Sequence, residues 1–108
     1  MAYRLAARLD DLWSGEMVGV SVGGRRLVLV NLEGEVHAYE DRCAHLGVAL
    51  SGGRLAGGML TCPAHEWCYD ARSGRGINPK TASLRRVAVR VEGDEIWVDV
   101  DAPAGAGG

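Results

Sequence analysis

The clearest structural pattern in the sequence is LRRVAVRVEGDEIWVDV, residues 84–100. From Leu84 to Val91 the bulky Val87, Val89 and Val91 alternate with Arg86, Ala88 and Arg90, the turn-forming residues EGD follow at 92–94, and Ile96, Val98 and Val100 resume the alternation. Alternation with a period of two is typical of a strand with one buried face, and Gly beside Asp marks a turn. These residues therefore predict an antiparallel hairpin.

The first forty residues contain further strand-like runs, of which residues 16–22 alternate. We expect four further strands, at residues 3–9, 16–22, 26–32 and 36–39. Gly23-Gly24 joins the second and third strands as a hairpin turn, and residues 10–13 read as one helical turn with Trp13 packed in the core. Short strands at close spacing predict an all-β protein.

The middle of the chain is less regular. Residues 41–58 contain two Gly pairs and no clear alternation, residues 59–61 are short and apolar, and only residues 67–70 read as a short strand. This irregular part holds all three cysteines and two of the three histidines. Because binding residues concentrate in loops on a rigid scaffold, we expect the functional site here. Residues 102–108, APAGAGG, are expected to form a flexible tail.

Composition narrows the possible functions. The chain has 108 residues, which suits one domain, and a formal net charge of −2. A nucleic-acid-binding protein usually carries a basic excess, so we expect no nucleic-acid partner. No apolar run has the length of a signal peptide or a membrane span, so we expect a cytoplasmic protein with no membrane contact. We also expect a monomer.

Four residues have the spacing of metal ligands. Cys43 and His45 form a C-x-H pair, and Cys62 and His65 form a C-x-x-H pair. Two thiolates and two imidazoles suit either tetrahedral zinc or a [2Fe–2S] cluster with mixed ligands. Structural zinc sites usually draw like ligands from one short loop, whereas here each loop offers one Cys and one His. The arrangement favours a [2Fe–2S] cluster on these four residues and leaves a zinc-stabilised interaction module as the alternative from another class.

The motifs CAHLG at 43–47 and CPAH at 62–65 resemble the two cluster-binding loops of Rieske proteins, in particular bacterial Rieske ferredoxins. The resemblance extends over nearly the whole chain. It implies an all-β Rieske fold of three stacked antiparallel sheets. It also implies a single domain over residues 1–101, in which an inserted subdomain at about 41–80 carries the cluster.

Two further stretches narrow the resemblance. DDLWSGEM at 10–17 and HEWCYD at 65–70, with GRGINP at 74–79, look like the ferredoxin of toluene-type diiron monooxygenases. This implies a non-catalytic electron carrier between an NADH-dependent flavin and iron–sulfur reductase and a diiron hydroxylase of aromatic or alkene substrates. The ferredoxin of an aromatic ring-hydroxylating dioxygenase is the alternative, and a redox sensor acting through Cys68 is a third hypothesis.

High-potential Rieske proteins resemble this chain but carry an additional Cys in each cluster loop, where this sequence has Val48 and Ala64. They also hydrogen-bond the cluster through a Ser and a Tyr just after the second His, a neighbourhood that Glu66 and Trp67 occupy here, so we expect both donors to be missing. Fewer donors imply a lower reduction potential.

Three other features have simple interpretations. Cys68 is expected to be a small packed residue and His37 an ordinary strand histidine, because the four ligands are already assigned. The arginines at 72, 75, 85 and 86 form either a basic docking patch or scattered solvated charge.

Overall fold

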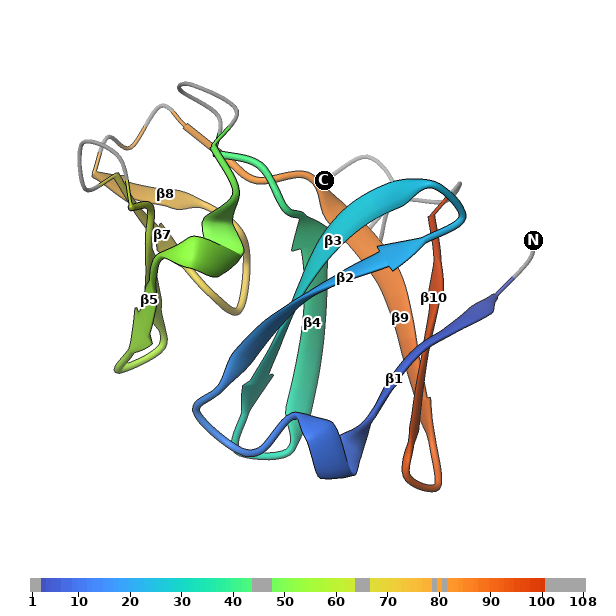
Figure 1. Ribbon diagram of the computed structural model, residues 1–108. Helices are drawn as coiled ribbons and strands as arrows, with labels where there is room; N and C mark the ends of the chain where they lie inside the picture. Colours follow the sequence, from blue (N-terminus) through green and yellow to red (C-terminus); the bar gives the residue numbers. More distant parts are fainter. Residues whose placement is uncertain (1–2, 44–47, 64–66, 79, 81, 101–108) are drawn as a thin grey trace.

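The computed structural model of the protein describes residues 3–43, 48–63, 67–78, 80 and 82–100. Within these ranges the chain forms ten strands, two short 3-10 turns and no α-helix (Figure 1). The strands are β1 (Arg4–Arg8), β2 (Met17–Val22), β3 (Arg25–Leu32), β4 (Glu35–Glu40), β5 (Arg54–Ala56), β6 (Met59–Thr61), β7 (Cys68–Asp70), β8 (Gly76–Asn78), β9 (Arg86–Glu92) and β10 (Glu95–Asp99). The turns are η1 (Leu9–Asp11) and η2 (Leu50–Gly52). The predicted all-β class is confirmed, and no helix in this described part could cross a membrane.

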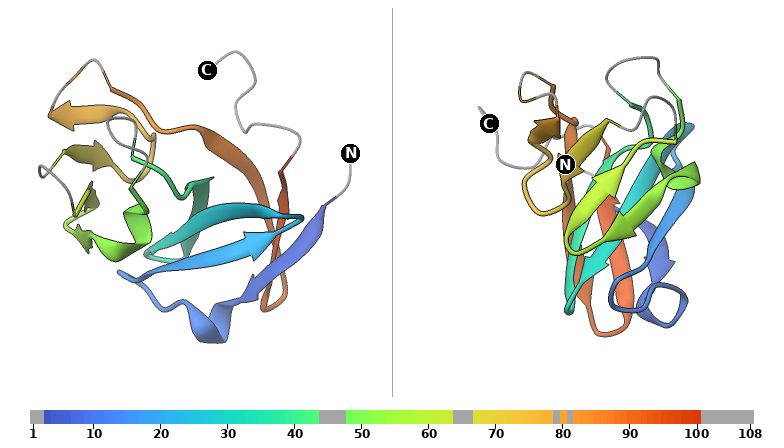
Figure 2. Two further views of the ribbon diagram at one scale, coloured as in Figure 1. Left: turned by 45° about the horizontal axis from the view of Figure 1, so that its top comes forward. Right: turned by 90° about the vertical axis from the view of Figure 1, so that its left-hand side faces the viewer.

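The strands form two antiparallel sheets. The larger sheet has the order β1-β10-β9-β4-β3-β2, and the smaller has the order β5-β6-β7-β8. Two three-stranded halves of the larger sheet join where β4 pairs with β9, with Tyr39 opposite Arg86. The resemblance implied three sheets, and two of these therefore form one continuous six-stranded sheet. The small sheet stacks beside the β2–β4 half, and the right-hand view of Figure 2 shows it in front of the larger sheet.

Strand β3 is buried on both faces, and its side chains alternate between two hydrophobic cores. Leu27 and Leu29 belong to the core inside the curled larger sheet. Val28, Val30 and Leu32 belong to a second core, which lies between the larger sheet and the small one. Because successive strand residues point to opposite faces, the uninterrupted run LVLV at 27–30 supplies both cores at once.

The segment before β2 differs from the sequence prediction. Trp13 was expected in the core but is 70% exposed, while the preceding Leu12 is fully buried. The buried amide of Asn31 explains this, because its Nδ2 donates to the Leu12 carbonyl at 2.8 Å and holds that residue against β3. With Leu12 turned inward, Trp13 faces solvent, where its Nε1 donates to the Asp10 carbonyl at 2.9 Å.

The sequence prediction also missed β5, β6, β8 and η2, all in the part called irregular. The three strands have three residues each, so none is long enough to show alternation. Turn residues Gly57 and Gly58 both have positive φ, at 59° and 76°, and they connect β5 to β6. The hairpin therefore depends on its turn and on pairing with neighbouring strands more than on its own sequence pattern.

Gly53 marks the closest backbone approach between the two halves of the small subdomain. A Cβ atom built there would lie 1.9 Å from the Thr61 carbonyl oxygen and 3.1 Å from Cδ of Pro63. At the adjacent Gly52 the nearest atom would be Cγ of Pro63 at 3.9 Å, an ordinary contact. Only a glycine at position 53 lets the end of η2 pack directly against β6.

We predict that Gly53→Ala lowers the free energy of unfolding by about 3 kcal/mol, because the methyl group forces backbone apart in a packed interior. Gly52→Ala is the matched control and should change stability by less than about 1 kcal/mol. Urea denaturation of both variants measures the difference. Equal stabilities for the two variants would contradict this account of the close approach.

Candidate metal centre

Two loops of matching construction carry the predicted ligands. Cys43 follows β4, and its N–H donates to the Val48 carbonyl at 2.8 Å. Cys62 follows β6, and its N–H donates to the Trp67 carbonyl at 2.7 Å. Each loop thus begins at a cysteine and is closed by a hydrogen bond to the carbonyl five residues later.

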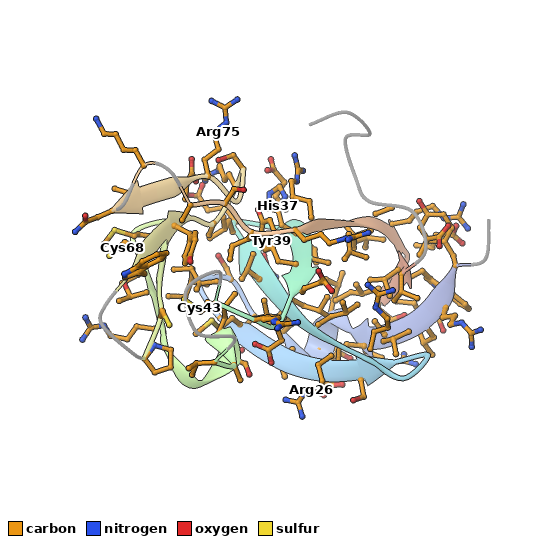
Figure 3. The ribbon with its side chains drawn as sticks, turned by 90° about the horizontal axis from the view of Figure 1, so that it is seen from above. Arg26, His37, Tyr39, Cys43, Cys68 and Arg75 are labelled. Carbon is orange, nitrogen blue, oxygen red and sulfur yellow. The ribbon has the colours of Figure 1, made fainter. Side chains whose placement is uncertain are left out.

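The structure brings the two predicted cysteine ligands into one interior. Cys43 is 2% exposed and Cys62 is 1% exposed, and both belong to the second core with Leu50 and Leu60. Neither forms a disulfide, and Figure 3 shows Cys43 inside the protein. Two thiols held together away from solvent fit a metal centre that binds them as thiolates.

The predicted histidine ligands cannot be placed in the same way. His45 lies within residues 44–47 and His65 within residues 64–66, which are outside the described residues. Ala64 and Glu66 are outside them as well. The full ligand set of Cys43, His45, Cys62 and His65 therefore stays a prediction.

A tyrosine that the sequence analysis missed lies beside the first cysteine. The hydroxyl of Tyr69 in β7 is 3.4 Å from the Cys43 sulfur, and its side chain is fully buried. A hydroxyl at this distance can donate to a thiolate. The expectation that this chain lacks the tyrosine donor of high-potential Rieske proteins is therefore wrong. The stretch between the second predicted histidine ligand and Tyr69 contains Trp67 and no serine.

A second buried tyrosine, Tyr39 of β4, bonds to the segment that follows β7. The Tyr39 hydroxyl donates to the Ala71 carbonyl at 2.7 Å, and burial raises the pKa of Tyr39 well above its usual range. The hydroxyl therefore stays protonated as a donor. Gly74, with φ of +79°, fits beside this ring, because a Cβ there would lie 2.7 Å from Cε1 of Tyr39.

A buried carboxylate ties the first loop to the larger sheet. Asp41, two residues before Cys43, accepts hydrogen bonds from the N–H and the hydroxyl of Ser51 at 2.8 and 2.7 Å. Its other partner is the Arg26 guanidinium of β3 at 3.5 Å. Gly19 of β2 leaves room for this arrangement, since a Cβ there would lie 2.7 Å from the Ser51 hydroxyl oxygen.

The remaining candidates lie away from both loops or serve structural contacts. His37 is in β4, where its Nε2 is 2.9 Å from Oε1 of Glu35 on the same strand face. Cys68 is half-buried in β7, and its sulfur is 3.8 Å from the Thr61 hydroxyl. These positions agree with the interpretation of His37 as an ordinary strand histidine and of Cys68 as a packed residue.

Comparisons with known proteins identify the family. The model of the Rieske [2Fe-2S] domain matches residues 3–91. The ferredoxin component of the alkene monooxygenase system of Xanthobacter autotrophicus is 40% identical over 94 residues, which cover 86% of this chain and 77% of that protein. The ferredoxin component of the naphthalene 1,2-dioxygenase system of Pseudomonas aeruginosa is 32% identical over 96 residues, covering 88% and 92%.

Solved structures agree with this assignment. The ferredoxin of carbazole 1,9a-dioxygenase from Nocardioides aromaticivorans superposes with a TM-score of 0.82 at 28% identity, covering 91% of this chain and 97% of that one. Its fold is thus the fold described above. With two buried cysteines at the starts of two matching loops, the chain belongs to the Rieske family, and its cofactor is a Rieske-type [2Fe–2S] cluster.

Proposed function

We propose that Cys43, His45, Cys62 and His65 hold the cluster and that the chain is an electron carrier with no substrate of its own. The observation that carries the proposal is the pair of buried cysteines, each at the start of a loop closed by the same type of hydrogen bond. In the sequence each predicted histidine falls inside one of these two loops. A Rieske centre takes both cysteines on one iron and both histidines on the other, so each loop supplies one ligand to each iron.

The cluster, when bound, takes up and releases one electron. The residues of the chain set the conditions for that exchange. Leu50 and Leu60 keep water from the two cysteines, and a low local dielectric strengthens the interaction of the Tyr69 hydroxyl with the Cys43 sulfur. The Asp41 contacts hold the first loop in register with the larger sheet.

The multicomponent system is the finer part of the proposal. We place the chain between an NADH-dependent flavin and iron–sulfur reductase and a diiron hydroxylase of aromatic or alkene substrates. The motifs at 10–17 and 65–79 support this, as does the 40% identity to a ferredoxin component of an alkene monooxygenase system. The ferredoxin of an aromatic ring-hydroxylating dioxygenase is the second candidate, because the naphthalene and carbazole dioxygenase ferredoxins match nearly the whole chain.

The organisation of the chain is proposed on the same basis. Residues 1–101 would form one Rieske domain with the cluster-binding subdomain at about 41–80, and residues 102–108 a tail. Because an NADH-dependent reductase acts in the compartment that contains NADH, we place the carrier in the cytoplasm. We expect it to be a monomer when it is not bound to the reductase or the hydroxylase. Family membership disfavours the zinc-module alternative, since the matching model describes an iron–sulfur domain.

Single cysteine substitutions test the ligand set. We expect Cys43→Ala and Cys62→Ala to lose the cluster, because the remaining thiolate cannot hold one iron alone. Cys68→Ala is the matched control and should retain two irons and two sulfides per chain. Chemical analysis of iron and sulfide, with electron paramagnetic resonance of the reduced protein, reads the outcome. Full iron content in Cys43→Ala, or stoichiometric zinc in the native protein, would contradict the assignment.

Removal of the Tyr69 hydroxyl tests its role at the cluster. A hydrogen bond to a thiolate stabilises the more electron-rich reduced state, so Tyr69→Phe should lower the midpoint potential. A difference of about 1 kcal/mol between the two redox states corresponds to about 40 mV for one electron. Tyr39→Phe is the control, because it removes a buried hydroxyl bonded to a backbone carbonyl. Equal shifts in the two variants would exclude a specific effect at the sulfur.

Reconstitution separates the two candidate systems. The reduced protein should be oxidised in stopped-flow experiments by a diiron hydroxylase from its own host and should support NADH-dependent oxygenation when the reductase is added. Hydroxylase oxidation should be at least about tenfold faster than oxidation by a ring-hydroxylating dioxygenase, because docking surfaces select partners through their charge. The reverse order of rates would favour the dioxygenase system.

A further inference from the structure

We propose that the exposed side chains of Arg75, Ile77 and Lys80 dock an acidic face of the reductase that loads this carrier with its electron. We call these three residues the β8 patch. The inference rests on the electron-carrier function proposed above and adds the chemistry of one partner. Four observations carry it: the distribution of charge, the lack of ion pairs, the shape around Ile77 and the position beside the second loop.

Charge is unevenly divided along the chain. Residues 41–84 carry five basic and three acidic side chains, a net charge of +2, whereas the other residues carry seven basic and eleven acidic, a net charge of −4. Two of the three acidic residues are engaged locally. Asp41 is buried against Ser51, and Oδ1 of Asp70 accepts from the Arg72 N–H at 2.9 Å. The third, Glu66, lies outside the described residues.

The basic residues of the two parts also differ in their partners. Outside residues 41–84, five of the seven basic side chains pair with carboxylates, namely Arg8, Arg25, Arg26, Arg85 and Arg90. Among the described residues, no ion pair involves any of the five basic side chains in the range 41–84, which are Arg42, Arg54, Arg72, Arg75 and Lys80. Charges that have no internal partner are available to a partner protein.

The four arginines considered in the sequence do not form one patch. Arg85 pairs with Glu40 at 3.7 Å. Arg72 lines a different hollow, with Gly57, Gly58 and Glu33. Arg75 instead shares a hollow of about 550 Å³ with Lys80, and Figure 3 shows its side chain pointing away from the protein body. A lysine that the sequence analysis did not consider thus completes the basic surface.

The hollow also has an exposed apolar side chain. Ile77 lines it and is 45% exposed. Strand β8 pairs with β7 at Gly76 and at Asn78 only, so the register shifts and Ile77 has no residue opposite. A bulge of this kind redirects a side chain, and here Ile77 and two cations line the same hollow. Docking sites usually combine apolar surface with charged groups.

The patch lies beside the second predicted cluster loop. Asn78 pairs with Cys68, and Cys68 directly follows Trp67, whose carbonyl closes the loop that begins at Cys62. Ile77 and Lys80 lie on either side of Asn78 in the chain. A protein docked over the β8 patch would therefore adjoin the proposed electron-transfer site.

The direction of electron flow selects the reductase over the hydroxylase. The cluster gains one negative charge when it is reduced. An acidic partner therefore binds the oxidised carrier more tightly than the reduced carrier. For the reductase, this favours binding of the oxidised carrier, which is its substrate, and release of the reduced carrier, which is its product. For the hydroxylase, the same preference would favour the oxidised carrier, which is its product, and would inhibit turnover.

Charge reversal tests the proposal. Arg75→Glu/Lys80→Glu should lower the second-order rate constant for reduction by the reductase purified from the same host by about tenfold at low salt. The loss should shrink as ionic strength rises, because exposed charges are screened. Arg54→Glu is the matched control, since β5 lies at the opposite edge of the small sheet, and it should stay within about twofold. Midpoint potential and visible circular dichroism should match wild type in all variants.

Cross-linking supplies a second readout. Lys80 is the only lysine in the sequence. A carbodiimide condenses its amine with a carboxylate of the reductase, forming an amide with net loss of water. We expect an adduct between the oxidised carrier and the reductase that maps to Lys80. Lys80→Arg should lose this adduct but keep the reduction rate, because the charge remains.

The outcomes separate the two proposals. If wild type accepts electrons but Arg75→Glu/Lys80→Glu matches Arg54→Glu at every salt concentration, the docking surface lies elsewhere and the inference fails. It also fails if only oxidation by the hydroxylase slows, which would make the patch the surface for the acceptor. If wild type takes no electron from any reductase of its host, the carrier function itself is wrong.

Discussion

The double burial of β3 is the constraint on which the rest of the structure depends. One face of this strand closes the core of the larger sheet, and the other packs in the core that contains Cys43 and Cys62. A register slip of one residue would exchange the two sets of side chains, sending Leu27 and Leu29 to the wrong core. The buried Asn31 helps to fix the register, because its side chain bonds the Leu12 carbonyl and the Gly34 N–H. The eight residues of β3 thus help to specify both the larger sheet and the core that contains the two cysteines.

The interior on the site side combines apolar packing with a few directed hydroxyl and carboxylate contacts. Tyr69 aims a hydroxyl at the Cys43 sulfur, Tyr39 bonds a carbonyl, and Asp41 holds Ser51. In a low dielectric each of these contacts is strong when made and costly when lost. The cysteine positions therefore depend on residues from β3, β4, β7 and η2 together. This explains how short and irregular segments can hold two loops in a fixed relation.

The sequence predicted the long elements well, because β2 and β9 alternate with a period of two and β3 returns as an apolar run after the Gly23-Gly24 turn. It failed where position is decided by contacts distant in the chain. Nothing local distinguishes Leu12 from Trp13; the Asn31 amide nineteen residues away decides which one is buried. Tyr69 was overlooked because its role depends on Cys43 in another loop. The cysteines of the candidate site were predictable because metal ligands leave a spacing pattern, whereas a donor to a ligand leaves none.

Redox tuning and partner choice occupy different places in this small protein. The groups that act on the cysteine sulfurs are buried, and the unpaired cations lie on the outside of the small sheet. Surface charges can therefore change without disturbing the interior, because exposed substitutions cost little stability. Relatives with the same fold are components of an alkene monooxygenase system and of a naphthalene dioxygenase system. A fold that keeps its electron site in a buried core can serve such different oxygenase systems by altering a few exposed side chains, among which the proposed β8 patch would meet the reductase.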